Sequence, residues 1–296
     1  MHNSKKKFYP NHFSKIINKL NLNHFPNLYR PSSYPLISGD YFRKISNHIF
    51  DESKTLNPGA VNFGDLVFLG GDLLENYFMN YHPHINNKYI LIIHNSTENV
   101  NFQIHDFLDD NIIHCFAKNL NTEQTKKLSC LPVGFKNKRY LNKEYNSAII
   151  KYHHSSIVTK KASKIFSCFK TNTHPARVDL EKLVNKLENV VHFDFLKEES
   201  YFNELSRHKF SICPRGTSQD SFRVWESLLV GTMPIMINNQ FSRNLKSSGI
   251  PIVIIDDWKQ LSNFKDDLYN FDIQELTNAK KFTTADYWSD IISQKI

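Results

Sequence analysis

Short, almost uninterrupted apolar segments alternate with helical segments along most of this chain. The apolar segments that predict strands are 65–69, 89–94, 112–116, 131–133, 164–169, 190–193, 210–213, 233–237 and 252–255. Because they show no polar alternation, both faces of each strand are expected to be buried, as in a parallel sheet covered by helices. The intervening segments that predict helices include 72–81, 176–187, 199–207 and 221–230. The alternation predicts an α/β fold.

The alternation is interrupted twice, and these interruptions predict the domain organisation. The chain up to about residue 60 shows no clear periodicity, and the polar segment 142–161 has the composition of a linker. We therefore expect two Rossmann-like domains, 1–155 and 156–296, with a cleft between them.

Composition excludes some classes of protein and favours an anionic partner. With 296 residues and 40% hydrophobic side chains, the chain can bury a sizeable core, which excludes a mainly disordered protein. Lys and Arg number 37 against 29 Asp and Glu, a formal net charge of +8. The excess favours phosphate, nucleotide, nucleic acid or an acidic glycan as partner. The coding bias of an AT-rich genome, which enriches Asn, Ile and Lys, explains the same excess.

The four cysteines, Cys115, Cys130, Cys168 and Cys213, form no C-x-x-C pair and no dense framework. Such spacing predicts reduced thiols.

No run approaches the ~20 apolar residues of a membrane span, so we expect a soluble protein in a cytoplasmic or cytosol-like compartment. Near the N-terminus, apolar residues at helical spacing alternate with lysines and predict either a surface helix or a basic amphipathic helix on a membrane; they are Phe13, Ile16, Ile17 and Leu20.

The segment 210–237 is the most informative for function. A predicted strand leads to Pro214 and Gly216, which favour a turn, and Asp220 or Ser221 can cap the following helix. A helix that begins at the carboxyl end of a parallel strand offers free N–H groups and a positive dipole to phosphate. This geometry predicts an anion site.

Charged side chains accompany that turn. Arg215 and Arg223 can supply planar donors to a diphosphate, although Arg223 can instead pair with Asp220. Glu226 lies three residues after Arg223, on the same helix face, so it can accept hydrogen bonds from sugar hydroxyls or form an intrahelical ion pair with Arg223.

The pattern C-P-R-G-x-x-x-D-x-x-R-x-W-E-x-L-x-x-G-x-x-P-I, from Cys213 to Ile235, resembles the signature of exostosin-like glycosyltransferases. Residues 169–177 are similar to the first strand, loop and helix of that family's donor domain. Four segments of the first half, 64–65, 89–96, 108–110 and 131–134, resemble the acceptor half of small bacterial and viral members. The resemblance covers roughly residues 35–290.

This resemblance implies a GT-B fold and a nucleotide-diphosphate sugar, with a UDP-sugar favoured, as donor for a carbohydrate or glycoconjugate acceptor. The residues expected at the donor are Arg177, Arg215, Gly216, Thr217, Ser218, Asp220, Ser221, Arg223 and Glu226. Many relatives carry a small residue at position 215, so an arginine there implies a stronger electrostatic contact with the donor. Because the chain shows no anchor or lumenal disulfides, Golgi residence is not implied.

The leaving diphosphate needs charge stabilisation, and the acceptor hydroxyl needs a base. No D-x-D triplet is present, so we expect the arginines to act without metal or other cofactor. His94, which ends an apolar strand at the expected cleft, is the first candidate base. Asp72 and Glu75 are its rivals, although helix capping also explains Asp72.

Other polar clusters predict no further ligand. The His82-Pro-His84 and His153-His154 pairs lack the partners of a tetrahedral zinc site. No nucleic-acid-binding signature accompanies the N-terminal lysines, so no nucleic acid is expected. The alternatives to a glycosyltransferase are another transferase on the same scaffold and a non-catalytic protein that binds sugar or nucleic acid. The sequence does not determine the oligomeric state.

Overall fold

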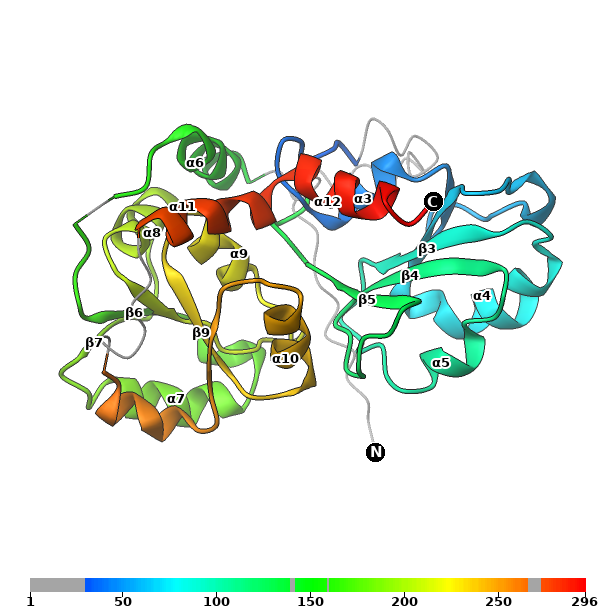
Figure 1. Cartoon of the computed structure of the whole chain (residues 1–296). Coiled ribbons are helices and arrows are strands. Elements are labelled where there is room, and N and C mark those ends of the chain that lie inside the picture. Colours follow the sequence, from blue (N-terminus) through cyan, green and yellow to red (C-terminus); the bar gives the residue numbers. More distant parts are fainter. Residues whose placement is uncertain (1–29, 139–141, 159, 266–272) are drawn as a thin grey trace, which may run out of the picture.

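The computed structural model describes residues 30–138, 142–158, 160–265 and 273–296. Within them the chain forms two five-stranded sheets, each wholly parallel, with helices packed around both (Figure 1). The predicted α/β fold with two Rossmann-like halves is confirmed. The membrane-surface helix predicted around Phe13, Ile16, Ile17 and Leu20 lies outside the described residues. No helix of the described chain is long and apolar enough to cross a membrane.

The strands of the first sheet follow one another in chain order. They are β1 (His48–Phe50), β2 (Leu66–Gly70), β3 (Tyr89–His94), β4 (Ile112–Lys118) and β5 (Leu128–Leu131). All six residues of β3, the central strand, are buried. This explains its continuous apolar sequence, because a central parallel strand contacts helices on both faces.

Helices cover both faces of the first sheet. The helices of this half are α3 (Gly39–Ile45), α4 (Leu74–Asn80) and α5 (Ile104–Phe107). Figure 1 shows α3 on one side of the sheet and α4 and α5 on the other. The prediction of an irregular chain up to residue 60 is therefore wrong for α3 and β1. Helix α3 begins at Ser38, whose side chain accepts a hydrogen bond from the N–H of Tyr41.

The second sheet has the order β10-β9-β8-β6-β7. Its strands are β6 (Ile165–Cys168), β7 (Val190–Phe193), β8 (Phe210–Ile212), β9 (Met233–Ile237) and β10 (Val253–Ile255). The chain enters the sheet with β6, adds β7 on one side and then adds β8, β9 and β10 on the other. The direction of winding reverses between β6 and β8, and open α/β sheets bind ligands beside such a reversal.

The connecting helices of the second half are α7 (Ala176–Val184), α8 (Glu198–Ser206), α9 (Phe222–Leu229) and α10 (Gln240–Ser247). Of these, α9 buries the largest share of its residues, and its Trp225 is fully buried. The helix begins at Ser221, whose hydroxyl accepts from the N–H of Arg223. It ends before Gly231, whose φ of +68° suits glycine.

The segment 142–161 is not the extended linker that its polarity predicts, because most of it forms α6 (Lys143–His154). Asn142 caps this helix by accepting from the N–H of Tyr145. Tyr145, Ala148 and Ile149 form a narrow buried stripe, and α6 packs against α8 and α9. The helix therefore belongs to the core of the second half.

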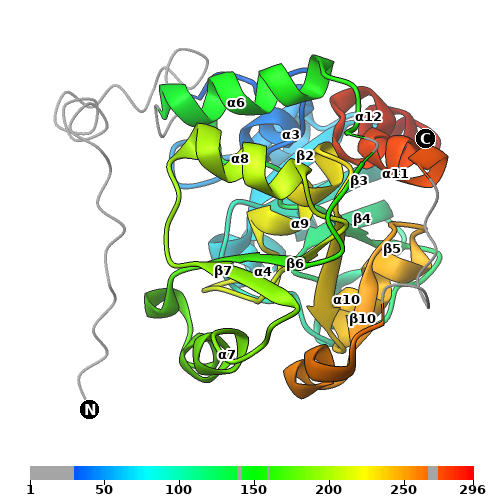
Figure 2. The same cartoon turned by 90° about the vertical axis from the view of Figure 1, so that its left-hand side faces the viewer.

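The C-terminal helices connect the two halves. Helix α11 (Ile273–Ala279) contacts α9, and α12 (Ala285–Ser293) lies beside α3 in both views (Figures 1 and 2). The Tyr41 hydroxyl of α3 donates to the carbonyl of Ala285 at 3.0 Å. Trp288 is 4% exposed and belongs to a hydrophobic core cluster with residues from both halves. Helix α12 thus packs on the first half, although it follows the strands and helices of the second half in sequence.

Most predicted elements occur within two residues of their expected bounds. The exception among the strands is β5, which ends at Leu131, whereas the sequence favours a strand over 131–133. Pro132 has no N–H for the sheet, so the ladder stops in front of it. All four cysteines are buried free thiols.

Candidate functional site

Two loops leave the second sheet at its reversal point. One follows β6 from Phe169 to Pro175, and the other follows β8 from Cys213 to Ser221. Both loops start at the carboxyl ends of neighbouring strands, where ligands of doubly wound sheets bind. The second loop contains most of the residues predicted to bind the donor.

Arg177 donates hydrogen bonds to both loops. Its Nε donates to the carbonyl of Arg215 at 2.7 Å, and its Nη2 donates to that of Pro214 at 3.0 Å. Its Nη1 donates to the carbonyl of Lys170, in the other loop, at 3.0 Å. Burial lowers the pKa of Arg177 to about 10, with a smaller contribution from the charge of Arg223, so the side chain is still a cation at neutral pH. The structure therefore places Arg177 at the predicted site, where it holds the loops in position.

Arg215 and Arg223 offer the more accessible guanidinium groups. Arg223 donates from Nε to the carbonyl of Cys168 at 2.7 Å, which directs it across the end of β6. Arg215 is exposed, and its Nε makes only a long 3.5 Å contact with the carbonyl of Gly216. Neither alternative ion pair of Arg223 is formed, because Asp220 and Glu226 bond to other groups.

The cationic groups of these loops influence one another. The pKa of His174 is lowered, first by burial and then by the charges of Arg215 and Arg177. Among the described residues, none of the three arginines forms an ion pair with a carboxylate. Positive charges gathered at a loop without a carboxylate partner are compensated well by a bound anion.

The smaller residues of the loop have distinct roles. The N–H of Gly216 donates to the carbonyl of Ser218 at 3.0 Å and closes a turn. A Cβ at position 216 would lie 3.2 Å from Nη2 of Arg177, so a larger residue there would displace that side chain. Thr217 is exposed. Ser221 caps α9, as the sequence suggested.

Ser218 and Asp220 join the two halves of the molecule. The Ser218 hydroxyl accepts from Lys118 at 2.9 Å and from Asn119 at 3.0 Å. The Asp220 carboxylate accepts from the N–H of Val133 at 2.5 Å and from Nε1 of Trp225 at 2.9 Å. Burial raises the pKa of Asp220 to about 6, although the charge of Lys118 opposes this. Both residues therefore hold the loop against the first sheet.

Glu226 faces other helices. Its two carboxylate oxygens accept from Tyr145 of α6 at 2.9 Å and from Tyr201 of α8 at 2.8 Å. Burial, followed by the charge of Glu226, raises the pKa of both tyrosines well above their ordinary value. Since both oxygens have internal partners, helix packing accounts for Glu226 without a ligand.

His94 has internal partners at both ring nitrogens. Its Nε2 lies 3.0 Å from the carbonyl of Pro132, and its Nδ1 accepts from the N–H of Asn95 at 2.7 Å. Burial, followed by the charge of Lys118, lowers its pKa to about 3. A neutral imidazole with these bonds is a weak base without a free lone pair. His94 lies at the carboxyl end of β3, as the sequence predicts, and its role as the base stays a prediction that these internal bonds weaken.

Asp72, one of the two rival bases, contacts a polar side chain of another loop. It is exposed, and its Oδ1 accepts from the Ser96 hydroxyl at 2.5 Å. No side chain caps the short 3₁₀ helix containing Asp72 or α4 behind it, so capping does not explain this residue. Glu75, in the first turn of α4, is exposed as well.

Lys118 is a site residue that the sequence interpretation missed. It ends β4, is 6% exposed, and donates to the carbonyl of Ser96 at 2.7 Å as well as to Ser218. Burial lowers its pKa to about 8, while the charges of Asp220 and Asp72 oppose this effect. The only sequence signal is a lysine at the end of the apolar segment 112–117. A buried lysine at the carboxyl edge of a sheet requires polar partners there.

A small cavity adjoins Lys118. It has a volume of about 30 Å³, and its walls include Gly71, His94, Ser96 and Glu98 of the first half. This is the space of about one water molecule. A more open depression of about 690 Å³, lined by Asn76, Tyr81 and other residues, contains none of the predicted site residues. The predicted cleft between the halves stays a prediction.

The chain is similar to a known protein in structure but matches none of the compared families or curated proteins in sequence. No family model matches the chain, and no curated protein matches it. Among solved structures it is similar to an α,α-trehalose-phosphate synthase (UDP-forming) from Burkholderia vietnamiensis, with a TM-score of 0.39 and 8% sequence identity. That match covers 81% of this chain and 71% of the synthase. A likeness at this level carries no information on activity.

Proposed function

We propose that this protein is a GT-B-type glycosyltransferase that takes a sugar from a nucleotide-diphosphate donor, with a UDP-sugar favoured. The observation that carries the proposal is the set of arginines at the reversal point of the second sheet: Arg177, Arg215 and Arg223. They lie on the loops where doubly wound sheets bind ligands, and no described carboxylate pairs with them. The resemblance of 213–235 to exostosin-like enzymes supports the same class. The acceptor in this proposal is a carbohydrate or glycoconjugate.

The arginines have different tasks in this proposal. Arg177 fixes the two loops through three backbone carbonyls. Arg215 and the Nη groups of Arg223 then bind the diphosphate. As the bond between the donor's sugar and its diphosphate breaks, negative charge develops on the leaving nucleoside diphosphate. Guanidinium groups already in position stabilise that charge without metal.

For proton removal from the acceptor, we propose Asp72. Its carboxylate is exposed at the carboxyl edge of β2, close enough to Lys118 for their charges to interact. His94 is a weaker candidate because both its nitrogens have partners. Loss of a general base lowers turnover by roughly 10²- to 10⁴-fold. Asp72→Asn is therefore expected to reduce kcat by this amount and to leave donor affinity within twofold.

The proposal is tested first by a thermal-shift screen with UDP, GDP, CMP, ADP and their sugars. A ligand that binds only the folded protein raises its Tm. The nucleotide that raises Tm is then assayed as its sugar, with release of the nucleoside diphosphate measured over a panel of glycan acceptors. A selective shift followed by acceptor-dependent release is the expected result. The absence of any nucleotide shift, together with salt-sensitive RNA binding, would instead support the binding-protein alternative.

The base assignment has its own control. Glu75→Gln removes another exposed carboxylate from the start of α4 and is expected to retain nearly full turnover. If Glu75→Gln loses turnover and Asp72→Asn does not, Glu75 rather than Asp72 is the base.

A further inference from the structure

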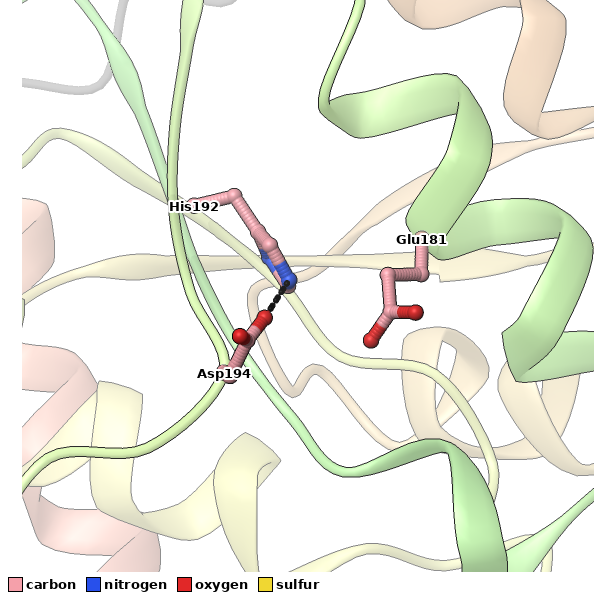
Figure 3. A group of neighbouring side chains, drawn as sticks. All are labelled: Glu181, His192 and Asp194. Carbon is pink, nitrogen blue, oxygen red and sulfur yellow. Dashed lines mark ion pairs between the residues drawn. The ribbon is translucent and has the colours of Figure 1, made fainter.

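A separate group of possible metal ligands lies beside β7. It consists of Glu181 from α7, His192 from β7 and Asp194, which follows that strand (Figure 3). Each residue contributes one ligand atom, and these atoms all lie within 4.8 Å of one another. Figure 3 shows the imidazole of His192 directed between the two carboxylates.

His192 has a buried nitrogen without a hydrogen-bond partner. Its side chain is 4% exposed, and its Nδ1 lies 2.9 Å from the hydroxyl of Ser167, its neighbour across the β6–β7 pair. Nε2 is buried and makes no hydrogen bond, and its nearest carboxylate contact is Oδ1 of Asp194 at 3.4 Å. When Nδ1 carries the proton and donates to Ser167, the lone pair of Nε2 faces two carboxylates. Such an arrangement is unfavourable unless a cation lies between these groups.

The spacing suits a small divalent ion. Zinc binds histidine nitrogen and carboxylate oxygen at about 2.0–2.2 Å, so two ligands of a tetrahedral site lie roughly 3.3–3.6 Å apart. The distance of 3.4 Å between His192 and Asp194 falls in this range. Glu181 is half-buried on a helix that packs on β7, so a change of its side-chain torsions brings its oxygen closer.

Charge and ligand type define the class of ion. Two carboxylates supply two negative charges, and no ion pair with lysine or arginine is seen for either of them in the described chain. Imidazole favours first-row transition ions, whereas Mg²⁺ and Ca²⁺ prefer oxygen ligands alone. We propose that Glu181, His192 and Asp194 bind one Zn²⁺-class divalent ion, with a fourth position left for water.

This site is distinct from the proposed diphosphate site. Its His192 lies on the outer strand β7, and the Phe169 ring contacts both His192 and Arg177: the Phe169 ring centre is 5.0 Å from that of His192 and 5.7 Å from the guanidinium carbon of Arg177. A bound ion joins α7 to the edge strand β7. Its effect is to stabilise the second half, and nucleotide binding does not require it.

The test is calorimetric titration of the full chain with ZnCl₂, on the wild type, Glu181→Gln and Asp194→Asn. The chain contains 14 histidines, so other weak zinc sites are expected, and the informative quantity is the difference between variants. Each variant is expected to lose one tight equivalent of zinc, or to bind it at least about tenfold more weakly. Both substitutions affect a half-buried or exposed side chain, so folding is preserved; His192→Asn is omitted because its burial makes misfolding a competing explanation.

Glu188→Gln is the matched control, because it removes an exposed carboxylate just before β7. It is expected to bind zinc as the wild type does and to show the same zinc-induced rise in Tm. Equal zinc binding by Glu181→Gln, Asp194→Asn and Glu188→Gln overturns the proposal. MgCl₂ binding at the same site as tightly as ZnCl₂ also overturns it, because the assignment depends on an imidazole ligand.

Discussion

At the scale of single residues, the buried polar groups near the sheet edges depend most on their hydrogen-bond partners. His94, Lys118 and Asp220 are each at most 6% exposed, and each has hydrogen-bond partners from distant parts of the chain. Burial lowers the pKa of the first two and raises that of Asp220. Each of these residues therefore links the stability of the fold to pH.

His94 makes the protein sensitive to acid. Its pKa is about 3 in the folded protein and 6.5 in the unfolded chain, so the unfolded state binds more protons between these values. Its contribution to stability is complete above pH 6.5 and is lost as the pH falls toward 3. Between pH 7 and 5 this loss is about 2 kcal/mol. Urea unfolding should show His94→Asn losing about 2 kcal/mol less than the wild type over this interval.

The exposed His84 provides the control for that experiment. His84→Asn should show the wild-type loss between pH 7 and 5. The account of His94 is wrong if both variants retain the wild-type pH dependence. Other groups, Asp220 among them, also titrate in this range, but they are present in all three proteins and cancel in the comparison.

At the scale of elements, helix α9 connects the candidate site to the helices behind it. Arg223, in the first turn of α9, donates to the carbonyl of Cys168 at the end of β6. Glu226, three residues later, accepts from tyrosine hydroxyls of α6 and α8. The sequence predicted the helix and its buried stripe because the apolar residues recur at helical spacing. It did not predict the partners of Glu226, because Tyr145 lies 81 residues away and sits in a segment whose polarity suggested a linker.

Glu226→Gln should reduce stability without reducing donor affinity. A glutamine presents an NH₂ group to one of two tyrosine hydroxyls that now donate, so one buried donor loses its acceptor. Such a loss costs about 1–3 kcal/mol. Chemical unfolding of Glu226→Gln measures this cost. Glu199→Gln, which removes an exposed carboxylate paired with Lys151, should change stability by less than about 0.5 kcal/mol.

The opposite result would contradict the structural role of Glu226. Unchanged stability of Glu226→Gln, combined with a large loss of nucleotide affinity, would return Glu226 to the ligand-binding role suggested by the sequence resemblance.

At the scale of the whole molecule, the carboxyl edges of the two sheets meet through polar contacts. Asp220, from the loop after β8, accepts from Val133 after β5, and Lys118 at the end of β4 donates to Ser218. The C-terminal helix α12 adds a second connection by packing beside α3. The candidate site thus depends on residues from both halves.

Asp220→Ala should destabilise the whole protein. It leaves the N–H of Val133 and the indole N–H of Trp225 without their acceptor, and it removes the larger of the two negative charges that act on the buried Lys118. The expected loss is about 2–5 kcal/mol in urea unfolding. Asp179→Ala removes an exposed carboxylate that pairs with Lys182 and should cost less than about 1 kcal/mol. Equal losses in the two variants would refute the proposed role of Asp220.

The sequence predicted the strands and helices of this fold better than the contacts between distant segments. Continuous apolar strands such as β3 and β9 are recognisable locally, because a strand that is buried on both faces contains almost only apolar residues. The return of α12 to the first half, the helical state of α6 and the burial of Lys118 depend on packing between distant segments. The position of Arg215 and Arg223 followed from strand, turn and cap signals, whereas the carbonyl partners of Arg177 required the folded loops.

The central claim is that the loops at the reversal point bind a nucleoside diphosphate. Its most direct test is calorimetric titration of wild type, Arg215→Ala and Arg207→Ala with the nucleoside diphosphate that raises Tm in the screen. Both substitutions remove an exposed arginine, but Arg207 lies at the end of α8 and pairs with Glu204. The account predicts at least about tenfold weaker binding by Arg215→Ala and no change for Arg207→Ala. Equal affinities in all three proteins would contradict it.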